Sequence, residues 1–128
     1  MASSYDYFLT GDHALAKDAV ARALASEGFR VETNAAGGFN AKRGSMAATV
    51  WLGAWGGNKR FHVSFLVQFF VDAHGQLVAR LNRDMASGML KGGAVGANMT
   101  RNAFIDTAAA LTVQLQASGI YAGELANN

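Results

Sequence analysis

The stretch that decides the fold is residues 60–72, RFHVSFLVQFFVD. From Phe61 to Val71, every second position holds an aromatic or β-branched residue, and the positions between them are mixed in character. Strict alternation at period two predicts a β-strand with one buried face. The other face of this strand then carries His62, Ser64, Leu66, Gln68 and Phe70.

The sequence on both sides of this strand predicts more strands. Short alternating segments are separated by glycine-containing turns, which tolerate the positive φ of tight hairpins. We therefore predict an antiparallel meander over residues 29–84, with strand candidates at 29–34, 39–42, 45–54, 60–72 and 77–84.

Two segments have the period of an amphipathic helix. The first is predicted over residues 12–27, because Asp12 can cap its start and Gly28 can end it. The second is predicted over residues 98–118, where Phe104, Ala108, Leu111 and Leu115 form one apolar stripe.

The remaining segments are a possible first strand at 4–10, a glycine-rich loop at 85–97 and a tail at 119–128. Together the elements predict a single α+β domain over residues 1–128, in helix–strands–helix order. We expect a two-layer sandwich in which two helices cover one face of an antiparallel sheet of four to five strands.

The composition excludes several classes of protein. The chain has 128 residues and no cysteine, so it has no disulfide framework, thiolate metal site or cysteine nucleophile. No signal peptide is visible, and the longest apolar run is too short for a membrane helix. We therefore expect a cytoplasmic protein without a membrane partner.

The net charge of +2 is unevenly distributed. Residues 30–101 contain nine basic and three acidic residues, whereas both flanks are acidic. A basic middle can attract an anionic partner, but it lacks the dense clusters of a dedicated nucleic-acid binder.

The uncovered face of the predicted sheet is the first candidate site. It is too apolar for a solvated face, which suggests contact with something else. Self-association, with a dimer favoured, is the first interpretation. Alternatives are cover from the chain's own termini, a small-molecule surface, and nucleic acid stacked on aromatic side chains. The candidate residues are Trp51, His62, Leu66, Phe70, Val78 and Arg80.

The glycine-rich loop is the second candidate site. Lys91, Gly92 and Gly93 precede the second predicted helix, and Arg101 falls in its expected first turn. Backbone N–H groups and two cations at a helix start can hold a phosphate or carboxylate. The spacing matches no nucleotide-binding motif, so a flexible crossover is the favoured interpretation.

The sequence shows no convincing catalytic group. His62 and Ser64 lie two positions apart on one strand, about 6.5 Å, which is too far for a direct hydrogen bond. Asp72 and His74 flank a turn, where both residue types are common. We expect no enzyme, no cofactor and no metal site, and a domain that self-associates or binds a protein partner. A module for an apolar or anionic small molecule is the alternative, followed by nucleic-acid binding.

Overall fold

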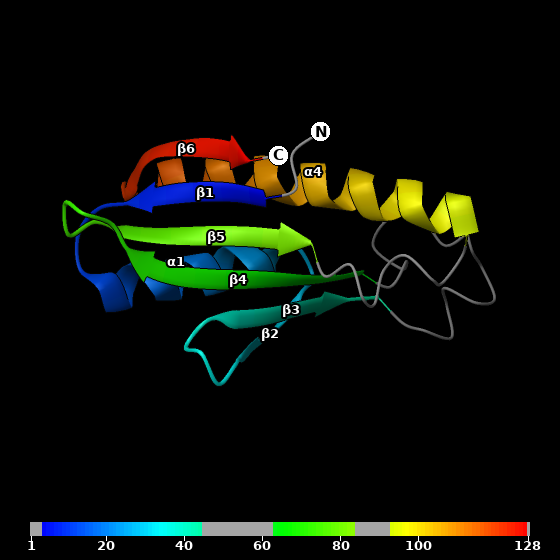
Figure 1. Cartoon of the computed structure of the whole chain (residues 1–128), viewed down its shortest axis with the longest axis horizontal. Helices are drawn as coiled ribbons and strands as arrows, with labels where there is room; N and C mark the ends of the chain where they lie inside the picture. The colour runs from blue at the N-terminus through cyan, green and yellow to red at the C-terminus, as the bar shows by residue number, and fades with distance from the viewer. Residues whose placement is uncertain (1–3, 45–62, 84–92, 128) are drawn as a thin grey trace.

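The computed structural model describes residues 4–44, 63–83 and 93–127, with the backbone alone over residues 93–100 (Figure 1). Six strands and two helices lie in this part of the chain. In chain order they are β1 (Ser4–Leu9), α1 (His13–Ser26), β2 (Arg30–Thr33), β3 (Phe39–Arg43), β4 (Val63–Val71), β5 (Leu77–Arg83), α4 (Gly93–Ala117) and β6 (Tyr121–Asn127).

All described strands belong to one antiparallel sheet of order β2-β3-β4-β5-β1-β6. The first four follow the chain and form a meander. β1 then lies beside β5, and β6 lies beside β1, so the first and last strands are neighbours (Figure 1). The predicted α+β class, with an antiparallel sheet and two helices, is confirmed for the described residues.

Three details of the predicted architecture were wrong. The sheet has six described strands where four to five were expected, and strands precede and follow the two helices. The expected tail at 119–128 contains β6. Gly119, with φ +76°, ends the helix, and the Thr10 N–H donates to the Ile120 carbonyl oxygen (2.8 Å), which aligns the last segment with β1. The predicted strand at 45–54 lies outside the described residues.

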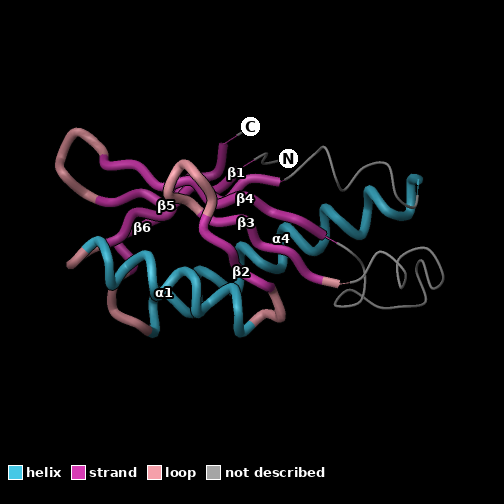
Figure 2. The backbone as a smooth tube through the Cα atoms, turned by 90° about the horizontal axis from the view of Figure 1, so that it is seen from below, coloured by secondary structure: helices cyan, strands magenta, loops and turns pink. Residues whose placement is uncertain are grey.

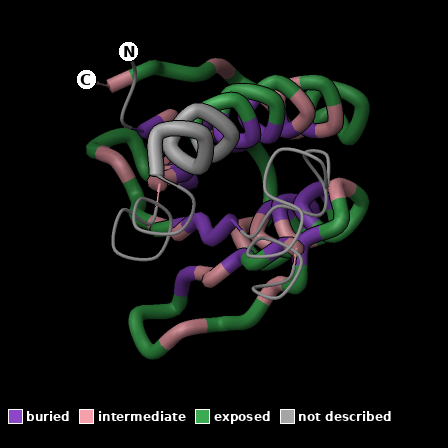
Figure 3. The backbone as a smooth tube through the Cα atoms, turned by 90° about the vertical axis from the view of Figure 1, so that its right-hand side faces the viewer, coloured by how far each residue is buried: buried purple, intermediate pink, exposed green. Residues whose placement is uncertain are grey.

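Both helices pack on the same face of the sheet. In Figure 2, α1 and the C-terminal part of α4 lie on one side of the strands. Buried residues of both helices and of this sheet face form one core, and exposed residues lie on the outer sides of the helices (Figure 3). Across the core, the Tyr7 hydroxyl donates to the Ala108 carbonyl oxygen (2.7 Å).

Aromatic rings fill the core where β4 faces α4. The ring centroid of Phe65 lies 5.4 Å from those of both Phe29 and Phe104, and Tyr5 lies 5.4 Å from Phe104. Tilted and edge-on contacts at this distance are favourable beyond the area that they bury. Val63, Phe65 and Val67 are therefore at the centre of the core, as the alternation predicts, whereas Val71 at the end of β4 is 53% exposed.

The first helix has the predicted cap. The Asp12 carboxylate accepts a hydrogen bond from the Leu15 N–H (3.0 Å), and Gly28 follows the last turn with φ +91°. The second helix begins earlier than expected, at Gly93 instead of residue 98, so part of the predicted glycine-rich loop is helical. Neither helix in the described part of the chain is long and apolar enough to span a membrane.

Candidate functional site

The sheet face opposite the helices is the main candidate site, and we call it the open face. The strand register places its side chains in rows across β4, β5, β1 and β6. One row contains Leu66, Asn82, Ser4 and Asn127, the next Gln68, Arg80, Asp6 and Leu125, and the third Phe70, Val78, Phe8 and Gly123.

An ion pair occupies the centre of the open face. Arg80 on β5 lies directly opposite Asp6 on β1, and its guanidinium donates two hydrogen bonds to the carboxylate: Nε to Oδ1 at 2.7 Å and Nη2 to Oδ2 at 2.9 Å. Asp6 is only 5% exposed. The bonds from Arg80 hold the pKa of Asp6 below its usual value, although burial acts in the opposite direction. The pair is therefore ionised at neutral pH, and two hydrogen bonds join its members.

Aromatic residues flank this ion pair. The Arg80 guanidinium lies 5.0 Å from the ring centroid of Phe70, close enough for a cation–π contact. Val78 lies between Phe70 and Phe8 in the register and is fully buried. Phe70 remains 40% exposed and Leu125 53% exposed. The open face thus presents apolar side chains around a charge that is already neutralised.

Polar side chains on the open face also bond to one another. The Asn82 amide donates to Gln68 Oε1 (2.9 Å), and the Asn127 amide donates to Ser4 Oγ (3.2 Å). Hydrogen bonds that are already formed lower the desolvation penalty of covering these groups.

Four residues of the first sequence-predicted site lie on the open face: Leu66, Phe70, Val78 and Arg80. Val78 is beneath the surface, so it supports the face without being available for contact. Trp51 and His62 lie outside the described residues.

Sequence reasoning missed the open-face residues of β1 and β6, among them Asp6, Phe8 and Leu125. Asp6 and Phe8 alternate with Tyr5, Tyr7 and Leu9, which is a strand signal, but nothing local shows that their strand lies in the sheet interior. Leu125 was missed because its segment was expected to be a tail.

The second predicted site is not assembled by the described residues. Lys91 and Gly92 lie outside them, and Gly93 is the first residue of α4. Arg101 is eight residues further along, about 12 Å at 1.5 Å per residue, so it is not in the first turn. The distance arises because the helix begins five residues earlier than its sequence pattern indicates.

Asp72, His74 and Ser64, which the sequence offers as weak catalytic candidates, have structural roles in the turn after β4 or in the sheet. The Asp72 carboxylate accepts hydrogen bonds from the N–H groups of His74 (2.9 Å) and Gln76 (3.0 Å), and so fixes the β4–β5 turn. Ser64 is buried on β4. Within the described ranges, no three His, Cys, Asp or Glu side chains gather to form a metal site.

Comparisons with known proteins reveal no relative of this chain. The chain matches no protein-family model, no curated protein and no solved structure.

Proposed function

We propose that this protein is a non-enzymatic module that self-associates as a dimer through the open face. The observation that supports it is a sheet with both helices on one side and exposed Phe70 and Leu125 on the other. Exposed apolar side chains on an ordered sheet are typical of protein contact surfaces. The lack of cysteine fits a reducing compartment, so we propose a cytoplasmic location.

The ion pair suits the centre of such an interface. Burying a lone guanidinium is strongly unfavourable, but Arg80 already has its carboxylate partner on the same chain. Phe70 stacks against it and extends the apolar area. A partner therefore gains contact with the rings and leaves no charge unpaired.

The same pair favours a second copy as the partner. In a twofold interface each patch meets itself, so a net charge at its centre would repel its own copy. The opposite charges of Asp6 and Arg80 cancel. The neighbouring side chains of Phe8, Gln68 and Phe70 are uncharged. The described centre of the open face is thus compatible with itself.

Nucleic-acid binding receives less support. Arg80 is engaged with Asp6, and Arg43 is buried on the helix side, where its guanidinium donates to the Glu27 carbonyl oxygen (2.9 Å). Binding to a phosphate backbone depends on accessible Lys and Arg side chains. Arg80 and Arg43, two cations of the basic middle, are therefore poorly available for it.

Sedimentation velocity over a range of concentrations tests the proposal. We expect the wild-type protein to dimerise, and Phe70→Glu to be monomeric at the same concentrations because two buried carboxylates would face each other. Val113→Glu is the matched control, since Val113 is 64% exposed on α4, away from the open face.

Circular dichroism shows whether each variant is folded. A wild-type monomer, or a folded Phe70→Glu variant with the wild-type mass, would contradict the proposal. A Val113→Glu monomer beside a Phe70→Glu dimer would place the interface on the helices instead.

A further inference from the structure

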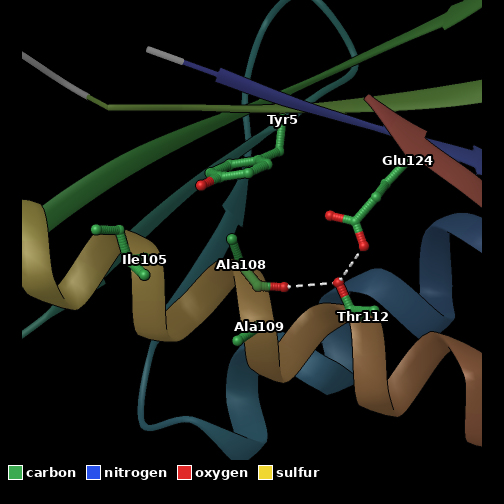
Figure 4. Close-up of a pocket in the computed structure, with 6 residues that line it drawn as sticks. All are labelled: Tyr5, Ile105, Ala108, Ala109, Thr112 and Glu124. Carbon is green, nitrogen blue, oxygen red and sulfur yellow. Dashed lines mark hydrogen bonds between the residues drawn. The ribbon is translucent and has the colours of Figure 1, made fainter. Parts of the chain in front are cut away.

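A hollow of about 350 Å³ lies between α4 and the β1–β6 edge of the sheet, on the helix side (Figure 4). It is independent of the open face, which is on the other side of the sheet. Its lining consists of Tyr5, Ile105, Ala108, Ala109, Thr112 and Glu124. Binding sites for small molecules commonly have volumes of 300 Å³ or more.

The walls of the hollow are mainly apolar. α4 contributes Ile105, Ala108 and Ala109, and the short alanine side chains leave the space empty. The Tyr5 ring covers the opposite side (Figure 4), where it is held against Phe104 at 5.4 Å between centroids. This surface suits a flat or aliphatic body about the size of a single ring.

One carboxylate stands at the end of the apolar surface. Glu124 Oε1 accepts a hydrogen bond from the hydroxyl of Thr112 on α4 (2.8 Å; Figure 4). It accepts a second one from the hydroxyl of Tyr121 on β6 (2.9 Å). Both hydroxyls contact the same carboxylate oxygen, and the Thr112 hydroxyl shares its one hydrogen with the Ala108 carbonyl oxygen at 3.1 Å. Burial, and the hydrogen bond and charge of the adjacent Glu124, raise the pKa of Tyr121 above its ordinary value. Its hydroxyl is therefore protonated and can donate at neutral pH, as an ordinary tyrosine would be.

The Glu124 carboxylate has no cationic partner among the described residues, whose ion pairs are Arg22–Asp18 and Arg80–Asp6. Within the same residues, the Tyr5 hydroxyl makes no hydrogen bond either. The hollow therefore combines an apolar wall, a carboxylate held by two hydroxyls and a Tyr5 hydroxyl that bonds to none of the described residues.

We propose that this hollow binds a small organic cation: a primary ammonium group on a short apolar body. The ammonium would donate to Glu124 and the body would lie along Ile105, Ala109 and the Tyr5 ring. An anionic ligand is disfavoured by the carboxylate, and an uncharged one loses the charge-assisted hydrogen bond.

NMR titration with phenethylammonium tests this proposal, with 2-phenylethanol as the uncharged ligand of similar shape. We expect phenethylammonium to give saturable shifts at the amides of Tyr5, Ile105, Ala109 and Thr112. We expect 2-phenylethanol to bind about tenfold more weakly, because one charge-assisted bond is lost.

Two variants test the contribution of the Glu124 charge and that of the cavity volume to ligand binding separately. Glu124→Gln should remove the preference for the amine, so that amine and alcohol bind alike, and Ala109→Phe should fill the hollow and weaken both ligands. Glu32→Gln, which removes an exposed carboxylate on β2 at the far edge of the sheet, should bind like the wild type.

Equal binding of amine and alcohol to the wild-type protein would overturn the proposal. So would undiminished amine binding by Glu124→Gln, or the absence of saturable shifts at the lining amides. None of these outcomes depends on whether the protein is a dimer, because Phe70 is not part of the hollow.

Discussion

At the scale of single residues, Asp6 and Arg80 are the most informative pair. They are 74 positions apart in the chain, yet two hydrogen bonds join them directly across neighbouring strands. Asp6 is buried and Arg80 is partly exposed, so the pair is more than a solvated surface contact. It links the N-terminal strand to the meander.

The first prediction concerns the acid stability of this pair. The folded pKa of Asp6 is lowered, so its stabilising effect is complete above the unfolded pKa of about 3.9 and is lost as the pH falls through the folded pKa. We expect Asp6→Asn to lower the free energy of unfolding at pH 7 by about 2 kcal/mol. Its difference from the wild type should shrink below about pH 4.

Urea unfolding at several pH values measures this difference. Asp18→Asn is the control, because Asp18 pairs with Arg22 on the exposed surface of α1, with both side chains more than half exposed. We expect that change to alter stability by less than about 0.5 kcal/mol at any pH. A constant gap between Asp6→Asn and wild type down to low pH would refute the role given to the pair.

At the scale of elements, β6 differs most from the sequence prediction. Its sequence YAGELAN contains no pattern of alternating large apolar residues, and most of the strand is exposed. It forms because β1 offers a free edge and because α4 ends at Ala117, after which the chain turns back along β1 through Gly119. Pairing with β1 and packing against α4 therefore decide its structure, and local propensity does not.

The second prediction compares the stability effects of replacing two glycines, Gly119 before β6 and Gly123 within it. Gly119 has φ +76°, and a Cβ there would meet no atom within 4 Å, so any loss in Gly119→Ala comes from the backbone alone. We expect a loss of about 1 kcal/mol, measured by thermal or urea unfolding. Gly123→Ala is equally unobstructed but has no positive φ, so it should be neutral or stabilise by about 0.5 kcal/mol. Equal effects of the two changes would contradict this explanation.

At the scale of the whole molecule, the sheet separates two surfaces. The helices and the hollow beside Glu124 are on one side, and Phe70 and the Asp6–Arg80 pair are on the other. The core between sheet and helices is closely packed with aromatic rings, and the residues that line one surface do not line the other.

The third prediction follows from this separation. We expect Phe70→Glu to bind phenethylammonium with the wild-type affinity while it remains monomeric. We likewise expect Glu124→Gln to dimerise normally. Titration of the first variant and sedimentation of the second measure both quantities. A change of more than about tenfold in the affinity for phenethylammonium, or in the dissociation constant of the dimer, would show that the two surfaces are coupled.

The sequence by itself determined the elements whose signals are local. The alternation in residues 60–72 predicts β4 and its buried face, and Asp12 and Gly28 delimit α1, because pleating and capping depend only on near neighbours. The same patterns predict Leu66, Phe70 and Arg80 on one face of the sheet, and the strand register confirms it.

Only the tertiary structure decided the rest. The interior position of β1, the pairing of β6, and the meeting of Asp6 with Arg80 join segments far apart in the chain. The hollow likewise depends on where α4 crosses the edge of the sheet. Local patterns tell which face of a strand is buried, but the partner that buries it is chosen by packing and hydrogen bonding over the whole molecule.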